Sequence, residues 1–71
     1  MKDEIPKLDT LEEILELALK KEQASFRFYD KLLNSTKVSI LKDIFEQLRD
    51  EESKHIQMIK RKLSSIKLGK G

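Results

Sequence analysis

The sequence of 71 residues lacks cysteine and lacks long apolar runs. Disulfide bonds, thiolate zinc sites and iron–sulfur clusters need cysteine sulfur, so this chain forms none of them. Residues 1–7 are mostly charged and are interrupted by Pro6, and no apolar stretch approaches the length of a signal or membrane-spanning segment. We therefore expect a soluble, cytoplasmic protein without a membrane partner.

Charge of one sign is nowhere concentrated enough to indicate a nucleic-acid partner. Basic and acidic residues are interspersed, as in residues 20–22 and 49–52, and the formal net charge is only +2. A nucleic-acid footprint would gather its cations on one face or segment, so we expect no such partner. The basic stretch 60–62, followed by Lys67 and Lys70, is interpreted as cations that favour a helix carboxyl end rather than as a binding patch.

What the sequence does contain is two long stretches with helical periodicity. The first begins at a recognisable cap, because Thr10 and Glu13 have the spacing of a capping box, and Asp9 is an alternative cap. The apolar pattern then continues, which predicts a helix over about 10–33.

A polar break separates the two helical stretches. Residues 34–36 are predicted as a turn, with Ser35 or Thr36 available to cap a second helix over about 37–66. So short a connection forces an antiparallel hairpin. The chain, residues 1–71, is therefore predicted as a single all-α domain.

A hairpin of two helices buries too little apolar surface to offset the entropy of ordering the chain. Self-association is therefore expected. A second hairpin, packed with its turn at the opposite end, gives a symmetric four-helix bundle. We predict a homodimer of this kind as the working unit.

Ionisable residues interrupt both of the apolar stripes that predict the buried helix faces. The two stripes step by three or four residues and consist of Leu11, Leu15, Ala18, Glu22, Ser25, Tyr29 and Leu32, and of Leu41, Phe45, Leu48, Glu52, His55 and Ile59. Burying a carboxylate costs several kcal/mol per ion even after relaxation, so Glu22 and Glu52 need a compensating partner. A bound metal ion provides one.

The spacing of the three ionisable residues suits a metal site. Glu52 and His55 are three residues apart and project from one helix face, while Glu22 lies at a similar distance from the turn, roughly 18 Å against roughly 24 Å. A twofold axis would duplicate the set into four carboxylates and two imidazoles, which is the inventory of di-iron carboxylate bundles. These donors suit iron or manganese, with zinc as a substitute.

Other interpretations of these residues stay open on the pattern alone. Glu52 and His55 can form a buried ion pair, or the helices can be rotated so that both residues and Glu22 face water. Tyr29 is interpreted as a core aromatic with a hydrogen-bonded hydroxyl, and a role beside the metal ligands is the alternative. Glu51 flanks the site and is interpreted as a surface charge, with orientation of His55 as the alternative.

The residues resemble the rubrerythrin branch of the ferritin-like superfamily. Glu22 followed by Tyr29 is similar to the first helix of those proteins. Their second helix is matched by Asp43, Ile44, Phe45, Arg49, Asp50, Glu51, Glu52, His55 and Met58. The spacing between Glu22 and Glu52 is especially close to encapsulated ferritins, which are two-helix proteins whose di-iron ferroxidase centre forms between two subunits, often in rings inside an encapsulin shell.

The resemblance implies iron ligation by Glu22, Glu52 and His55 from each of two chains in a ferritin-like four-helix bundle. It also implies a larger ring and an encapsulin nanocompartment as partner and location. We expect oxidation of ferrous iron by dioxygen or peroxide at this centre. The alternatives are a peroxide-reducing oxidoreductase that uses an external electron donor, and a non-catalytic metal-binding or structural helical dimer.

Overall fold

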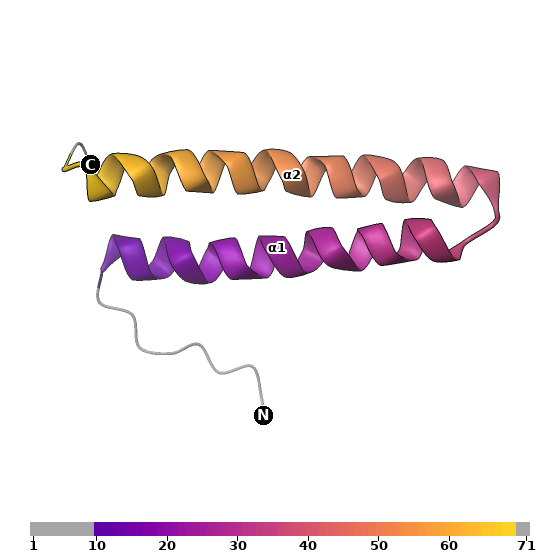
Figure 1. Ribbon diagram of the computed structural model, residues 1–71, viewed down its shortest axis with the longest axis horizontal. Coiled ribbons are helices and arrows are strands. Elements are labelled where there is room, and N and C mark those ends of the chain that lie inside the picture. Colours follow the sequence, from indigo (N-terminus) through magenta and orange to yellow (C-terminus); the bar gives the residue numbers. More distant parts are fainter. Residues whose placement is uncertain (1–9, 70–71) are drawn as a thin grey trace, which may run out of the picture.

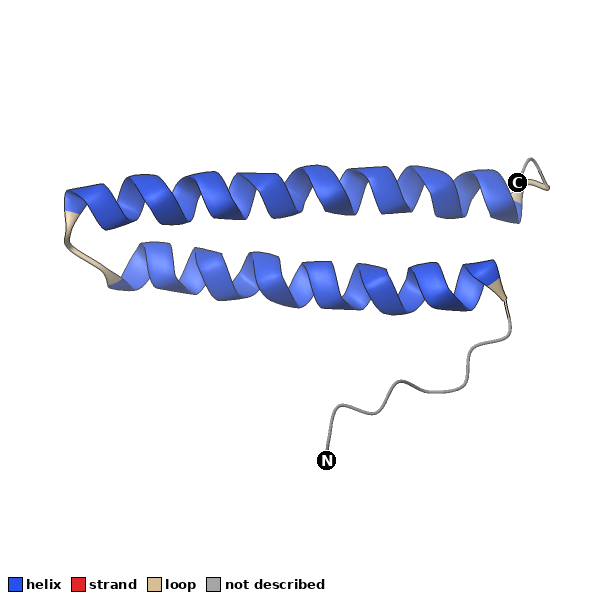
Figure 2. Cartoon of the chain, turned by 180° about the vertical axis from the view of Figure 1, so that it is seen from behind, coloured by secondary structure: helices blue, strands red, loops and turns tan. Residues whose placement is uncertain are grey.

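The computed structural model describes residues 10–69, which form two helices, α1 (Leu11–Ser35) and α2 (Ser39–Lys67), and no strand. The helices lie side by side and run in opposite directions, joined by the short connection 36–38 (Figures 1 and 2). The prediction of an all-helical hairpin is confirmed for this part of the chain. Neither helix is long and apolar enough, within the described range, to cross a membrane.

The amino end of α1 has the predicted cap. The Thr10 hydroxyl oxygen accepts a hydrogen bond from the Glu13 N–H (3.0 Å), and the Thr10 N–H donates to Glu13 Oε1 (3.2 Å). Glu12 and Glu13 also place negative charge on the first turn, where the helix dipole favours it. Asp9, the alternative cap, lies outside the described residues.

The first helix ends later than predicted, at Ser35 rather than near residue 33. Asn34 Nδ2 donates to Asp30 Oδ2 (3.4 Å) and the Ser35 hydroxyl donates to the Lys31 carbonyl (2.7 Å). Each polar side chain thus bonds to the preceding turn of the same helix instead of interrupting it. The connection therefore comprises residues 36–38 instead of the predicted 34–36.

The second helix begins at Ser39, two residues later than predicted, and has no side-chain cap. Its N-cap residue is Val38, whose side chain has no hydrogen-bonding group. The Thr36 hydroxyl oxygen instead accepts from the Val38 N–H (3.2 Å) and tightens the connection. The prediction that Ser35 or Thr36 caps this helix was therefore wrong.

The second helix ends at Lys67, one residue beyond the predicted end. Gly69 follows shortly after, and its φ of 78° is in the left-handed region that glycine tolerates.

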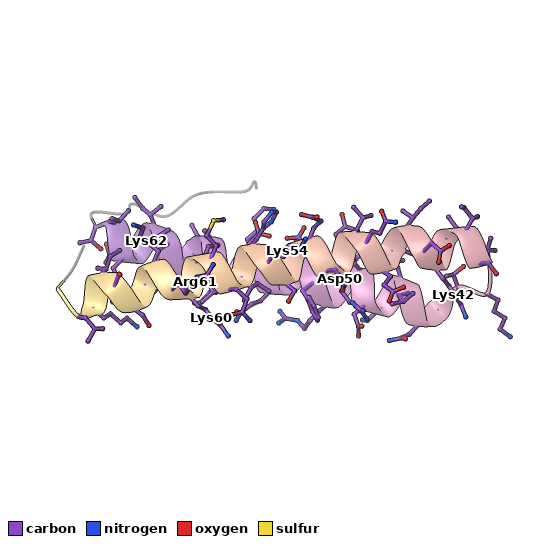
Figure 3. The ribbon with its side chains drawn as sticks, turned by 90° about the horizontal axis from the view of Figure 1, so that it is seen from above. Lys42, Asp50, Lys54, Lys60, Arg61 and Lys62 are labelled. Carbon is purple, nitrogen blue, oxygen red and sulfur yellow. The ribbon has the colours of Figure 1, made fainter. Side chains whose placement is uncertain are left out.

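The hairpin leaves most of its apolar surface uncovered. Among residues 10–69, only Leu63 is buried, with 6% of its surface exposed. Exposed apolar residues lie on both helices, and we call five of them together the open face: Leu11, Ile14, Leu41, Ile44 and Leu48. Charged side chains such as Asp50, Lys54 and Arg61 instead lie on the side of α2 that points away from α1 (Figure 3).

Candidate metal centre

The structure brings the three predicted ligands together near the middle of the hairpin. Glu22 lies on α1, and Glu52 and His55 lie one turn apart on α2. His55 Nδ1 is 3.4 Å from Glu22 Oε1 and 3.6 Å from Glu52 Oε1. One potential ligand atom from each of the three residues lies within 4.8 Å of the other two. Side chains that are 30 or more positions apart in sequence therefore converge on a volume the size of one ion.

The three side chains differ in depth. The exposed fraction of the side chain is 19% for Glu52, 29% for Glu22 and 46% for His55. Glu52 is thus the least accessible to solvent of the three side chains, whereas His55 is the most accessible. Glu52 Oε1 is buried and has no hydrogen-bond partner within the described chain.

An unsatisfied carboxylate oxygen is costly, since it has lost water without gaining a donor. A divalent cation would satisfy this atom. Two carboxylates and a neutral imidazole are donors that iron and manganese accept readily and that zinc also accepts. The residues therefore fit a metal ion on the chemistry of the donor set and on the orphaned oxygen.

The pKa values of the two carboxyl groups shift in opposite directions. The hydrogen bond that Glu52 shares with Glu22, together with burial, raises the pKa of Glu52 above 4.5. The same hydrogen bond lowers the pKa of Glu22, with a further contribution from His55, although burial acts in the other direction. Two neighbouring carboxyl groups cannot both ionise cheaply, so Glu52 takes up a proton more readily than Glu22 does. A cation between the two groups would favour their ionised forms.

The two neighbouring residues that the sequence singled out lie outside the trio. Glu51 forms an exposed ion pair with Lys54 (3.8 Å), and within residues 10–69 it makes no contact with His55. The Tyr29 ring meets the Phe28 ring edge to face, with 5.3 Å between their centroids. The expected hydrogen bond of the Tyr29 hydroxyl is absent from the described part of the hairpin.

Sequence reasoning missed an ion pair that joins the two helices near the site. Arg49 lies on α2, one turn before Glu52, and its Nη1 is 3.0 Å from Oδ1 of Asp30 on α1. No spacing rule connects these two residues, because they lie on different helices. Only the register of the antiparallel pair could have identified them as partners.

The rubrerythrin family model matches residues 13–71, a range that contains all three candidate ligands and nearly all of both helices. No curated protein and no solved structure matches the sequence.

Proposed function

Because this chain belongs to the rubrerythrin family, we propose that Glu22, Glu52 and His55 bind iron and that the protein oxidises ferrous iron at a centre shared by two subunits. The observation that carries the proposal is the convergence of these three side chains within 4.8 Å of one another. The unsatisfied Glu52 oxygen supports it, because that atom has no hydrogen-bond partner among residues 10–69.

Sharing of the centre follows from the number of donors. One hairpin offers two carboxylates and one imidazole, too few to enclose two ions. A second hairpin related by a twofold axis would double the set to the four carboxylates and two imidazoles of di-iron bundles. The open face supports this arrangement, because its apolar side chains and the half-exposed His55 are available for contact with a second hairpin.

The protein side chains have distinct tasks in this proposal. Bound iron supplies the interchange of ferrous and ferric states that couples to dioxygen or peroxide. Glu22 and Glu52, both ionised, would balance the positive charge of the ions. His55 points its Nδ1 atom toward both carboxylates, so that its imidazole would complete the set of ligands. The apolar residues of the open face, covered by the partner, would keep bulk water away from the centre.

Anaerobic titration with ferrous iron, followed by exposure to oxygen, tests the proposal. Wild-type protein should bind about one iron per chain and oxidise many more ferrous ions over time. Glu52→Ala should abolish the oxidation, because it removes a ligand twice from a symmetric site. The control is Glu51→Ala, which deletes the adjacent exposed carboxylate and should retain wild-type activity. Absence of iron binding by the wild-type chain would sink the proposal.

Membership of the rubrerythrin family also favours a second candidate, reduction of peroxide at the same centre with electrons from an external donor. The two candidate functions are distinguished by which substrate the protein consumes over many turnovers. Sustained peroxide consumption with a supplied reductant, without accumulation of oxidised iron, supports the second candidate. Sustained oxidation of ferrous iron supports the first.

The resemblance to encapsulated ferritins extends the proposal to larger assemblies. We place the dimer within a larger ring and name an encapsulin shell as its partner, with the nanocompartment as its location. Co-expression with an encapsulin, followed by purification of intact shells, tests this part separately. A chain that stays outside the shells would contradict it and leave the iron chemistry untouched.

A further inference from the structure

Arg49 is held on two sides by carboxylates. Its Nη1 contacts Asp30 Oδ1 of the opposite helix at 3.0 Å, and its Nη2 and Nε each lie 3.4 Å from Asp50 Oδ1. Asp30 in turn accepts a hydrogen bond from Asn34 (3.4 Å) through its other oxygen. The guanidinium group is planar and cannot rotate freely once both of its edges are engaged. Arg49 therefore has one defined orientation, with only 25% of its side chain exposed.

This is the shortest ion pair between the helices within residues 10–69. The Lys67–Glu16 pair, near the open end of the hairpin, has a separation of 3.7 Å and more exposed side chains. The Arg49–Asp30 pair lies between the connection and the candidate metal centre, since Asp30 is about 8 Å and Glu22 about 20 Å from the end of α1.

Burial of some apolar side chains would favour a different rotation of α2 about its axis. Leu48 and Ile44 are 38% and 44% exposed, so a rotation of α2 that turned them toward α1 would bury these two side chains within a single hairpin. The same rotation would turn Arg49 outward and carry Glu52 away from Glu22, because Arg49 and Glu52 lie about 60° apart around the helix. Packing therefore competes with the arrangement that brings the ligands together.

We propose that Arg49 and Asp30 are positioning residues that hold α2 in the rotation required to set Glu52 opposite Glu22. In the rotation that this ion pair holds, Leu48 and Ile44 are not buried against α1. Both side chains therefore stay exposed on the open face. The metal-binding part of the inference rests on the proposed function, whereas the rotation itself is a property of the metal-free chain.

The rotation is tested without metal by pulsed electron paramagnetic resonance. Nitroxide labels at Lys20→Cys and Gln57→Cys, both exposed positions, report the distance between the helices, with labelled chain diluted in excess unlabelled chain. Arg49→Gln and Asp30→Asn should each broaden the distance distribution or add a second distance. Lys67→Gln, the matched control that removes a different ion pair between the helices, should leave the wild-type distribution unchanged. An unchanged distribution in both Arg49→Gln and Asp30→Asn overturns the inference whether or not the protein binds metal.

The consequence for the ligands is tested with Co²⁺, whose visible absorption reports its coordination. Arg49→Gln should weaken Co²⁺ binding about tenfold, the usual range for residues that orient metal ligands, and should alter the absorption bands. Arg49→Lys keeps a positive charge toward Asp30 but lacks the second guanidinium edge that contacts Asp50. It should recover part of the lost Co²⁺ affinity. Equal affinities in Arg49→Gln and Lys67→Gln would contradict the positioning role. A wild-type chain that does not bind Co²⁺ would instead refute the proposed function, and the resonance measurement would still decide the rotation.

Discussion

Glu52 is the residue on which the proposed chemistry of the hairpin depends most. It is the least exposed of the three candidate ligands, and one of its oxygens lacks a hydrogen-bond partner in the described chain. Its carboxyl group therefore destabilises the metal-free hairpin, and a bound cation would relieve this. Function and stability should respond to changes at this residue with opposite signs.

Replacement of Glu52 by leucine tests that opposition. An apolar side chain of similar size removes the unsatisfied oxygen, so the free energy of unfolding of the metal-free protein should rise by about 1 kcal/mol. Binding of ferrous iron should be lost in the same variant, and with it the stabilisation that the metal gives to the wild type. Urea unfolding with and without anaerobic ferrous iron measures both effects. Destabilisation of the metal-free variant would show that the Glu52 carboxylate is satisfied by a partner.

The raised pKa of Glu52 makes the stability of the metal-free protein depend on pH. The folded chain retains the Glu52 proton at pH values where the unfolded chain, with a value near 4.5, has released it. The stabilisation from the protonated group is therefore complete below 4.5 and is lost as pH rises through the folded pKa. The lowered pKa of Glu22 acts in the opposite sense, as its contribution is lost when pH falls.

Glu52→Gln isolates the Glu52 contribution, because the amide donates a hydrogen bond toward Glu22 at every pH. We expect the wild type to lose stability relative to this variant as pH rises above 4.5, so that the variant is the more stable protein at neutral pH. Urea unfolding of both metal-free proteins across the acidic and neutral range gives the difference. A difference that does not change with pH would argue against a raised pKa of Glu52.

At the level of the helices, the two amino ends are capped unequally. Thr10 and Glu13 satisfy two backbone N–H donors at the start of α1, whereas Val38 offers α2 no side-chain acceptor. The first-turn N–H groups of α2 therefore receive no hydrogen bond from a capping side chain. This turn adjoins the connection, so its stability affects how firmly the hairpin closes.

Val38→Asp should supply the missing cap. An aspartate at the N-cap position accepts from the first-turn N–H groups and favours the positive end of the helix dipole, so we expect a gain of about 1 kcal/mol in the free energy of unfolding. Val38 is 51% exposed, and little packing is lost. The control is Lys37→Asp, which puts the same side chain one position before the cap. An equal gain from both substitutions would assign the effect to charge alone.

At the scale of the whole molecule, the hairpin is an incomplete unit. A single buried residue, Leu63, is the whole core of the part that the structure describes. The proposed partner covers the open face and completes the metal centre in one step. Metal should therefore tighten the dimer, and dimerisation should tighten metal binding, by the same coupling free energy.

Leu48→Lys tests this linkage on the open face. A charge buried in the interface should weaken the dimer, and iron affinity should fall with it, although Leu48 is not a candidate ligand. Gln47→Lys adds the same charge at the neighbouring exposed position and serves as the control. Light scattering at several concentrations, with and without ferrous iron under nitrogen, measures the association. A monomer that oxidises iron at the wild-type rate would overturn the shared centre.

The sequence by itself determined the features that depend on neighbours along one helix. Thr10 and Glu13 form their cap because both groups belong to one turn, and the step of three residues from Glu52 to His55 sets both on one face. The short polar connection was likewise enough to predict the antiparallel hairpin. It was misplaced by two residues because the backward hydrogen bonds of Asn34 and Ser35 extend α1.

Only the tertiary structure decided what depends on how the helices are rotated against each other. Periodicity assigns a wide apolar arc to each helix. It does not say which part of the arc packs against the other helix and which part stays exposed. The depth of Glu52, the exposure of His55 and the Arg49–Asp30 pair all follow from that rotation. Rotation is set by contacts between residues far apart in the chain, and such contacts leave no periodic signal in the sequence.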